Sequence, residues 1–161
     1  MESAPAPQPQ PQPPQPPRPP APLTPSEELT PSEERTWAML AHLSILLNLV
    51  TGLLGLVGAL IIYLVYQNRS RYVAYHALQS LIFQLIAWLG GGILTGVAWA
   101  ITGVLSAILV GLLCIPLALV ISLIPLGGIV YGIIGGIQCS QGQDFRYWLV
   151  GDWVRGTLTG D

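Results

Sequence analysis

Charged side chains are scarce in this sequence, and the places where they are missing decide the class of protein. Only six basic and eight acidic residues occur in 161, or 9%, whereas a typical soluble domain carries roughly 25%. Between Thr36 and Gln143 the only charged residues are Arg69 and Arg71. A chain of this size cannot bury that much apolar surface in a water-soluble fold, so an ordinary soluble enzyme is excluded.

Two further shortages narrow the function. The six arginines are scattered and the net charge is −2, so the basic patch of a nucleic-acid-binding protein is missing. The only two cysteines, Cys114 and Cys139, lie in apolar stretches without other metal-ligand residues at useful spacing. We therefore expect reduced structural thiols, no metal, no cofactor and no nucleic-acid partner. The remaining composition, 52% hydrophobic with a mean hydropathy of +0.59, indicates an all-α polytopic membrane protein in contact with the lipid bilayer.

The N-terminal region differs sharply from the rest of the chain. Thirteen of the 15 prolines precede Thr36, and proline removes backbone donors and fixes φ. Residues 1–29 are therefore predicted to be a disordered Pro/Gln-rich tail. A helix should begin after Thr30, because Thr30, Pro31 and Glu33 form a helix-start pattern.

The first charge-free run, Thr36 to Asn68, is too long for one upright membrane helix, which needs about 20 residues. Gly52, Gly55 and Gly58 interrupt its middle, and glycine disfavours a helix interior. We predict a hairpin of two helices at about 31–50 and 53–66; one long tilted helix is the alternative.

The second charge-free run, Tyr72 to Gln143, holds two long spans or three ordinary ones. Taking Pro116 as a helix start, we predict helices at about 72–113 and 116–138. The helical domain then covers 30–143 with about four spans, and all flanking arginines fall on one side. By the positive-inside rule, both termini and the Arg69–Arg71 loop are cytoplasmic in a bacterial plasma membrane; five spans would export Arg146 and Arg155.

The last segment, 144–161, alternates aromatic and charged residues with apolar ones. This pattern is typical of an amphipathic segment that lies in the membrane interface.

Polar side chains inside the predicted spans are candidate functional residues. They are His42, Asn48, His76, Gln79 and Gln84. His42 and His76 are predicted at a similar shallow depth, where they could meet as an interhelical hydrogen-bonded pair or as a proton relay or metal pair. Without a carboxylate or thiolate, two histidines make a poor metal site, so hydrogen bonding is the simpler interpretation.

Small residues four apart share one helix face and let another backbone approach closely. Two such series occur in the second half of the sequence, and they predict helix packing within the monomer or with a second copy. They comprise Gly92 and Gly96, and then Gly128, Gly132 and Gly136.

Three blocks of this sequence resemble a bacterial family of small membrane proteins related to the twenty-kilodalton membrane subunit of the chloroplast inner-envelope translocon (TIC). They are Arg35–Ser44, with its Ala-His-Leu-Ser, Tyr75–Gln84, which includes a histidine followed by Phe-Gln, and the polar stretch Gln141–Tyr147. The resemblance implies a four-helix membrane bundle, with His42, His76 and Gln84 as matching polar positions and no catalytic role attached to them.

Three function classes follow from these observations. The resemblance suggests a non-enzymatic scaffold or helper in membrane protein insertion or translocation, with other membrane proteins or a second copy as partners. A small-solute or ion conduit is the alternative, and it predicts a continuous polar stripe across the membrane. An enzyme is disfavoured, because the spans contain no carboxylate and show no nucleophile–base pair.

Overall fold

The computed structural model describes residues 29–159, and within them every regular element is helical. The predicted tail, 1–29, lies almost wholly outside these residues. The elements follow one another as α1 (Pro31–Leu43), the short 3₁₀ turn η1 (Ser44–Leu46), α2 (Leu47–Thr51), α3 (Leu54–Tyr66), α4 (Arg71–Gln84), the π-helical turn η2 (Leu85–Gly90), α5 (Gly91–Ser106), α6 (Gly111–Ser140) and α7 (Gly151–Thr159).

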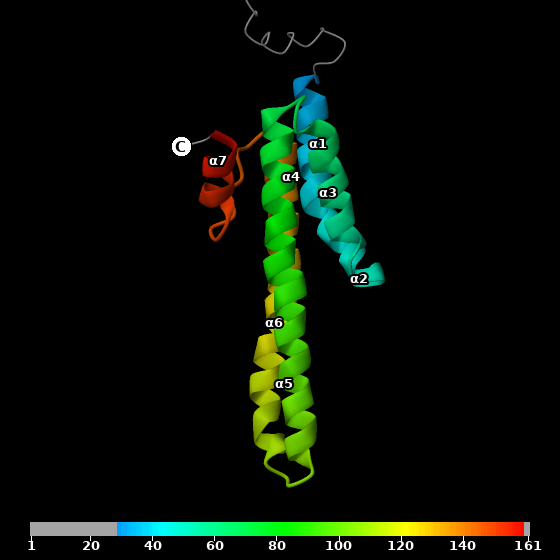
Figure 1. The fold of residues 1–161 in the computed structure, drawn as a ribbon, viewed down its shortest axis with the longest axis vertical. Coiled ribbons are helices and arrows are strands. Elements are labelled where there is room, and N and C mark those ends of the chain that lie inside the picture. Colours follow the sequence, from blue (N-terminus) through cyan, green and yellow to red (C-terminus); the bar gives the residue numbers. More distant parts are fainter. Residues whose placement is uncertain (1–28, 160–161) are drawn as a thin grey trace, which may run out of the picture.

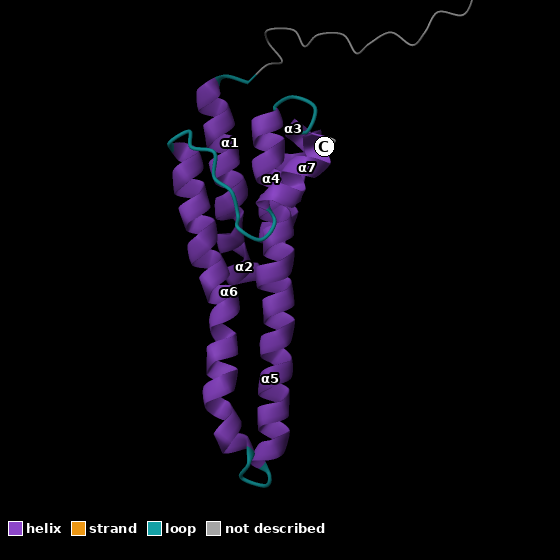
Figure 2. Ribbon diagram, turned by 90° about the vertical axis from the view of Figure 1, so that its left-hand side faces the viewer, coloured by secondary structure: helices purple, strands orange, loops and turns teal. Residues whose placement is uncertain are grey.

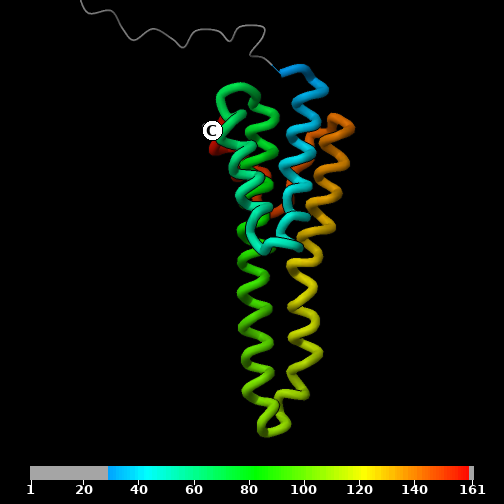
Figure 3. Tube along the Cα trace, turned by 90° about the vertical axis from the view of Figure 1, so that its right-hand side faces the viewer, coloured from blue at the N-terminus to red at the C-terminus, as the bar shows by residue number. Residues whose placement is uncertain are grey.

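The chain makes two hairpins of unequal length. Helices α1, η1 and α2 run away from the N-terminal end and α3 returns beside them; α4, η2 and α5 then form one long rod, and α6 returns along its whole length (Figure 1). The short hairpin covers only the half of the long hairpin near the N-terminal end (Figure 3). Helix α7 lies at that same end, beside α4.

Local sequence accounts for the start and the turn of the short hairpin. Thr30 and Glu33 form a reciprocal capping box, and Pro31 occupies the first helical position. The turn after α2 places Gly52 at φ +80°, a left-handed conformation that glycine adopts at no steric cost.

The turn of the long hairpin lies at residues 107–110, earlier than the sequence predicted. Pro116, which was expected to start a helix, lies inside α6 together with Pro125. Membrane helices tolerate internal proline because neighbouring groups satisfy or shield the freed carbonyl. The turn contains no glycine, and Leu109 takes φ +61° instead, so the usual glycine signal of a turn is missing.

Two helices are long and apolar enough to cross a membrane: Arg71–Ser106, with 36 residues, and Gly111–Ser140, with 30. Helix α3 is apolar but has only 13 residues, and α2 ends part-way along the long hairpin (Figure 2). The all-helical class is thus confirmed for the described residues, with two candidate spans; the first predicted span is divided among α1, η1 and α2, and the second, α3, is shorter than a full crossing.

The C-terminal segment belongs in part to the helical core. Phe145, Tyr147, Val150 and Val154 are buried, and the chain after α6 descends between α6 and α4 before α7 begins (Figure 2). Trp148, Leu149 and Trp153 are exposed, as an interfacial anchor requires. The prediction of an interfacial segment therefore needs one correction: alternate side chains pack into the bundle.

Candidate functional site

A fully buried polar cluster lies where α1, α4 and α6 meet. His42 from α1, His76 from α4 and Cys139 from α6 have no exposed surface. His42 Nε2 lies 3.3 Å from His76 Nδ1, and Cys139 Sγ lies 3.4 Å from that same nitrogen. The three residues offer ligand atoms that all lie within 4.8 Å of one another.

The segment after α6 closes this cluster from the side. The Tyr147 hydroxyl lies 3.0 Å from His42 Nδ1, and the Tyr147 ring stacks on Phe83 with 3.9 Å between centroids and 8° between planes. Phe145 packs edge-on against His42. The histidine pair is therefore sealed by aromatic side chains from a segment about 100 residues later in the chain.

The orientation of the Gln79 side chain determines the tautomer of His76. Gln79 Nε2 donates to the Phe145 carbonyl at 2.8 Å, and Gln79 Oε1 accepts from the Tyr147 amide at 3.3 Å. The remaining hydrogen on Gln79 Nε2 points to His76 Nδ1 at 3.0 Å. His76 Nδ1 is thus an acceptor, and the proton of the neutral ring is on Nε2.

A second polar group lies deeper in the bundle, toward the turn of the short hairpin. Asn48 Nδ2 donates to Gln84 Oε1 at 2.9 Å, and Gln84 Nε2 donates to Ser44 and Ser80 at 3.0 and 3.2 Å. Asn48 Oδ1 accepts from the Gly55 amide at 2.8 Å. These bonds join α1–α2, α3 and α4, and in a membrane each such bond contributes about 0.6–1.7 kcal/mol.

The glycines of α6 are the contact points between α6 and the helices around it. A Cβ at Gly132 would lie 2.9 Å from Ile45 Cγ2, and one at Gly136 would lie 2.9 Å from the Leu43 side chain. At Gly128 the nearest atom would be Ala87 Cβ, also at 2.9 Å. Gly92 and Gly96 have no atom within 4 Å of such a Cβ. The first three therefore serve packing within the monomer, and the last two do not.

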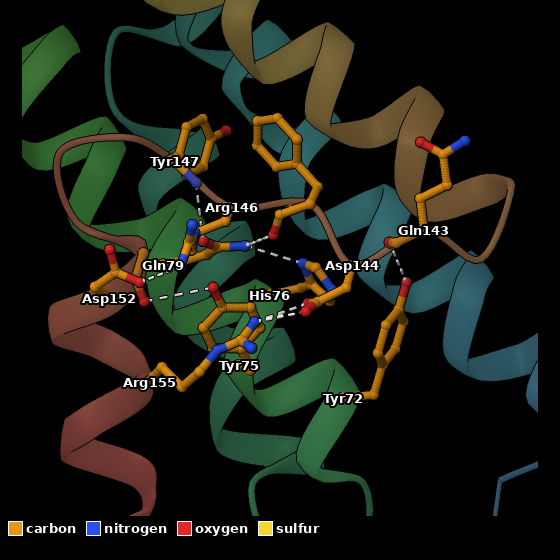
Figure 4. A network of polar contacts seen from close by, with 12 residues as sticks. Tyr72, Tyr75, His76, Gln79, Gln143, Asp144, Arg146, Tyr147, Asp152 and Arg155 are labelled. Carbon is orange, nitrogen blue, oxygen red and sulfur yellow. Dashed lines mark hydrogen bonds and ion pairs between the residues drawn. The ribbon is translucent and has the colours of Figure 1, made fainter. Parts of the chain in front are cut away.

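Polar contacts at the charged end fasten the C-terminal segment to α4 (Figure 4). The Tyr72 hydroxyl donates to the Gln143 carbonyl at 3.1 Å, and Tyr75 donates to the Gly151 carbonyl at 3.4 Å. Arg155 pairs with both oxygens of Asp144 at 2.7 and 2.9 Å, and these hydrogen bonds raise the pKa of Arg155. A cavity of about 460 Å³ lies between α4 and α7, lined in part by Arg71, Tyr75 and Arg155.

The structure buries all five polar residues selected from the sequence, His42, His76 and Gln79 in one group and Asn48 and Gln84 in the other, and it adds residues that the sequence did not indicate. Cys139 was dismissed as a ligand because of its spacing along the chain, yet the fold places its sulfur beside His76. Tyr147 was assigned to a surface segment and instead contacts His42. Ser44 and Ser80 gave no signal, because serines in membrane helices usually bond to their own backbone; Ser80 reaches across to the Ala41 carbonyl at 2.7 Å.

Comparison with known proteins identifies the family to which this chain belongs. The model of the MamF/MmsF family, described as magnetosome magnetite crystal formation proteins, matches residues 33–154. The chain belongs to the MamF/MmsF family. The match extends from the first turn of α1 into α7 and includes both buried polar groups. No curated protein and no solved structure is significantly similar to the chain.

This membership corrects the resemblance drawn from the sequence. The blocks around His42 and His76 were attributed to a family related to the TIC translocon, but the family that matches is MamF/MmsF. The order of short polar blocks along membrane helices was too general a feature to separate two families of small helical membrane proteins. The translocation role that rested on that resemblance is therefore withdrawn.

Proposed function

We propose that this MamF/MmsF protein is a non-enzymatic membrane component of magnetite crystal formation that acts through the shape of its bundle. The observation that carries the proposal is the unequal length of the two hairpins. Family membership supports the crystal role, and the geometry supports this mode of action.

Because the helices differ in length, the protein is wider in one half of the membrane than in the other. At 1.5 Å per residue, the 36-residue rod of α4 to α5 is about 54 Å long, whereas the 13 residues of α3 reach only about 20 Å. A bilayer has a hydrocarbon core of about 30 Å. The short hairpin therefore lies mainly in the leaflet nearest the charged end, with the charged first turns of α1 outside the hydrocarbon core, and the long hairpin alone continues through the other leaflet.

The surface of the short hairpin is suited to lipid rather than water. Its exposed side chains on α3 are aliphatic: Leu54, Val57, Leu60, Ile61, Leu64 and Val65. Its turn exposes Val50, Leu53 and Leu54 as well. These residues favour a partly inserted hairpin, in place of the two complete spans that the sequence suggested.

A membrane protein that is wider in one leaflet fits best where that leaflet is convex. The wide end carries the arginines of the described chain: Arg35, Arg69, Arg71, Arg146 and Arg155. By the positive-inside rule this end faces the cytoplasm. The protein is then best accommodated in a small closed compartment whose outer leaflet is the cytoplasmic one.

The burial of the polar cluster supports the absence of an enzymatic activity. Cys139 and His76 are close enough to act as a thiol–imidazole pair, but both side chains are completely buried. A nucleophile needs access to its substrate, and the aromatic side chains of Phe145 and Tyr147 close the approach.

Reconstitution into vesicles of two diameters tests the shape mechanism. Ser32 is exposed at the wide end, so Ser32→Cys in a Cys114→Ser background reports orientation through a membrane-impermeant maleimide. We expect a higher protein density per lipid, and more outward-facing wide ends, in small vesicles than in large ones. Equal densities and orientations at both diameters would contradict the proposal.

A control variant distinguishes the effect of the bundle shape from that of the amphipathic C-terminal helix, because such helices are themselves curvature-sensitive. Trp148→Ala with Trp153→Ala removes the exposed tryptophans just before and within α7 and changes neither hairpin. The vesicle preference should persist in this variant. The crystal role is tested separately: in a magnetite-forming host, loss of the gene should change crystal dimensions in electron micrographs, and unchanged crystals would refute that role.

A further inference from the structure

We propose that His42, His76 and Cys139 form a buried binding site for a divalent transition-metal cation of the Zn²⁺ or Fe²⁺ type. The site lies between α1, α4 and α6, each of which contributes one ligand. It is independent of the shape mechanism, because it rests on the side-chain geometry at the centre of the bundle.

The distances between the three donor atoms fit a tetrahedral centre. Zinc bonds of about 2.0–2.1 Å to nitrogen and about 2.3 Å to sulfur imply about 3.3 Å between two nitrogens and about 3.6 Å between nitrogen and sulfur. The structure has 3.3 Å between His42 Nε2 and His76 Nδ1, and 3.4 Å between Cys139 Sγ and His76 Nδ1. Two of the three edges thus match such a face, and the ligand atoms of all three residues lie within 4.8 Å of one another.

Hydrogen bonding alone leaves this cluster poorly satisfied. Gln79 Nε2, His42 Nε2 and Cys139 Sγ all lie around His76 Nδ1, which has a single lone pair in the ring plane. One acceptor cannot serve three donors well. A cation would replace the crowded donors with three metal–ligand bonds.

The neighbouring groups permit the proton changes that binding requires. The Cys139 thiol loses one proton to the solvent and becomes a thiolate. The His42 proton moves from Nε2 to Nδ1, where the Tyr147 hydroxyl at 3.0 Å can accept a hydrogen bond. His76 Nδ1 already lacks a proton, and the metal would take the place of the hydrogen bond that this nitrogen accepts from Gln79 Nε2. Binding of one cation therefore releases one proton per chain, as metal binding to a thiol generally does.

The ligand types select the class of metal. Two imidazoles and one thiolate suit zinc, iron and related transition metals, whereas magnesium and calcium require oxygen ligands. Three protein ligands leave a fourth position on the metal, which a small ligand such as water would fill. The Tyr147 hydroxyl on His42 is the kind of outer contact that orients a metal-bound imidazole.

Cobalt titration of the full chain in detergent tests the site. Cobalt(II) replaces zinc in such sites, and a bound thiolate produces a charge-transfer absorption in the near ultraviolet. We expect saturation at one cobalt per chain, release of one proton per cobalt, and a higher unfolding temperature, because the ligand binds only the folded state. Because the site is buried, the titration is repeated with cobalt present during refolding.

The two cysteines provide a matched pair of variants. Cys139→Ser should abolish the charge-transfer band and the thermal shift, whereas Cys114→Ser, on the outer half of α6, should retain both. Tyr147→Phe keeps the stacking on Phe83 and removes only the outer contact, so cobalt affinity should fall about 10-fold to 100-fold. Circular dichroism of each variant verifies the helical fold.

Competition then identifies the metal. Displacement of cobalt by Zn²⁺ alone assigns a zinc-type site, and displacement by anaerobic Fe²⁺ assigns a site that holds iron; both results support the proposal. A wild-type protein that shows neither absorption nor proton release by either route would overturn it. A band that persists in Cys139→Ser would overturn it as well.

Discussion

The two halves of the long hairpin are similarly apolar in sequence but are built in different ways. The half near the charged end is surrounded by α1, α3 and the C-terminal segment, and it contains both buried polar groups. In the outer half α5 and α6 pack against each other, and their apolar side chains, such as Val104 and Leu113, are largely exposed. Polar side chains therefore mark where helices gather, and purely apolar stretches mark where lipid is the neighbour.

The difference also appears in the polar groups themselves. In the outer half, Thr102 and Ser106 bond back to carbonyls of their own helix. Trp99 Nε1 reaches across to Ser122 at 3.0 Å, and Thr95 Oγ1 donates to the Ile121 carbonyl at 3.5 Å, so isolated bonds join α5 to α6 here. In the inner half, side chains from three or four elements share bonds. The cluster does not continue as a polar stripe through the outer half of the described chain, which is unfavourable for a conduit.

The largest difference in stability between the two halves is expected when one methyl group is added to a glycine in each. Gly132→Ala forces a Cβ to within 2.9 Å of Ile45 Cγ2 and 3.4 Å of the His42 carbonyl, and such overpacking costs about 1–3 kcal/mol. Gly96→Ala meets no atom within 4 Å and should leave stability unchanged or raise it by up to about 1 kcal/mol. Unfolding in mixed micelles measures both; equal losses would contradict the assignment of Gly132 to a packed interface.

Removing one buried amide should also destabilise the inner half more than the outer half, with a smaller difference in the free energy of unfolding. Gln84→Leu deletes bonds to Asn48, Ser44 and Ser80 and is expected to cost about 2 kcal/mol, since bonds in membranes are worth about 0.6–1.7 kcal/mol each. Ser122→Ala deletes the one bond from Trp99 and should cost less than about 1 kcal/mol. The same unfolding assay compares them, and a Gln84 variant as stable as the Ser122 variant would refute the importance of the network.

The smallest effect concerns the start of α1, which brings His42 to the cluster. Thr30→Ala removes the capping box and should cost about 1 kcal/mol at neutral pH. Hydrogen bonds from Thr30 hold the pKa of Glu33 below its ordinary value. The carboxylate therefore stabilises the fold above the pKa of the unfolded chain, and this contribution is lost as pH falls through the lowered pKa.

The difference between wild type and Thr30→Ala should accordingly shrink on acidification. Unfolding midpoints measured at neutral pH and below the pKa of Glu33 test this. A difference that grows toward acid would show that the cap does not depend on the Glu33 carboxylate. Glu34→Gln, one residue later, serves as the control for a general loss of negative charge near the helix start.

Helical class, membrane class and the five larger buried polar residues could all be read from the sequence. The scarcity of charge over the apolar stretch forces burial in lipid, where only helices or closed barrels satisfy the backbone, and polar residues such as Gln84 then need partners. Span length was harder to predict. The turn at Leu109 lacks a glycine, and Pro116 is a break signal that a membrane helix overrides.

Tertiary structure alone decided which polar residues meet. Cys139 and His76 are 63 positions apart, and Tyr147 and His42 are 105 apart, so no spacing rule connects either pair. They meet because close packing at Gly132 and Gly136 brings α6 against α1, and because the segment after α6 folds back between α6 and α4. Composition determines which solvent surrounds a helix, whereas the contacts that turn scattered side chains into one site depend on how the helices pack.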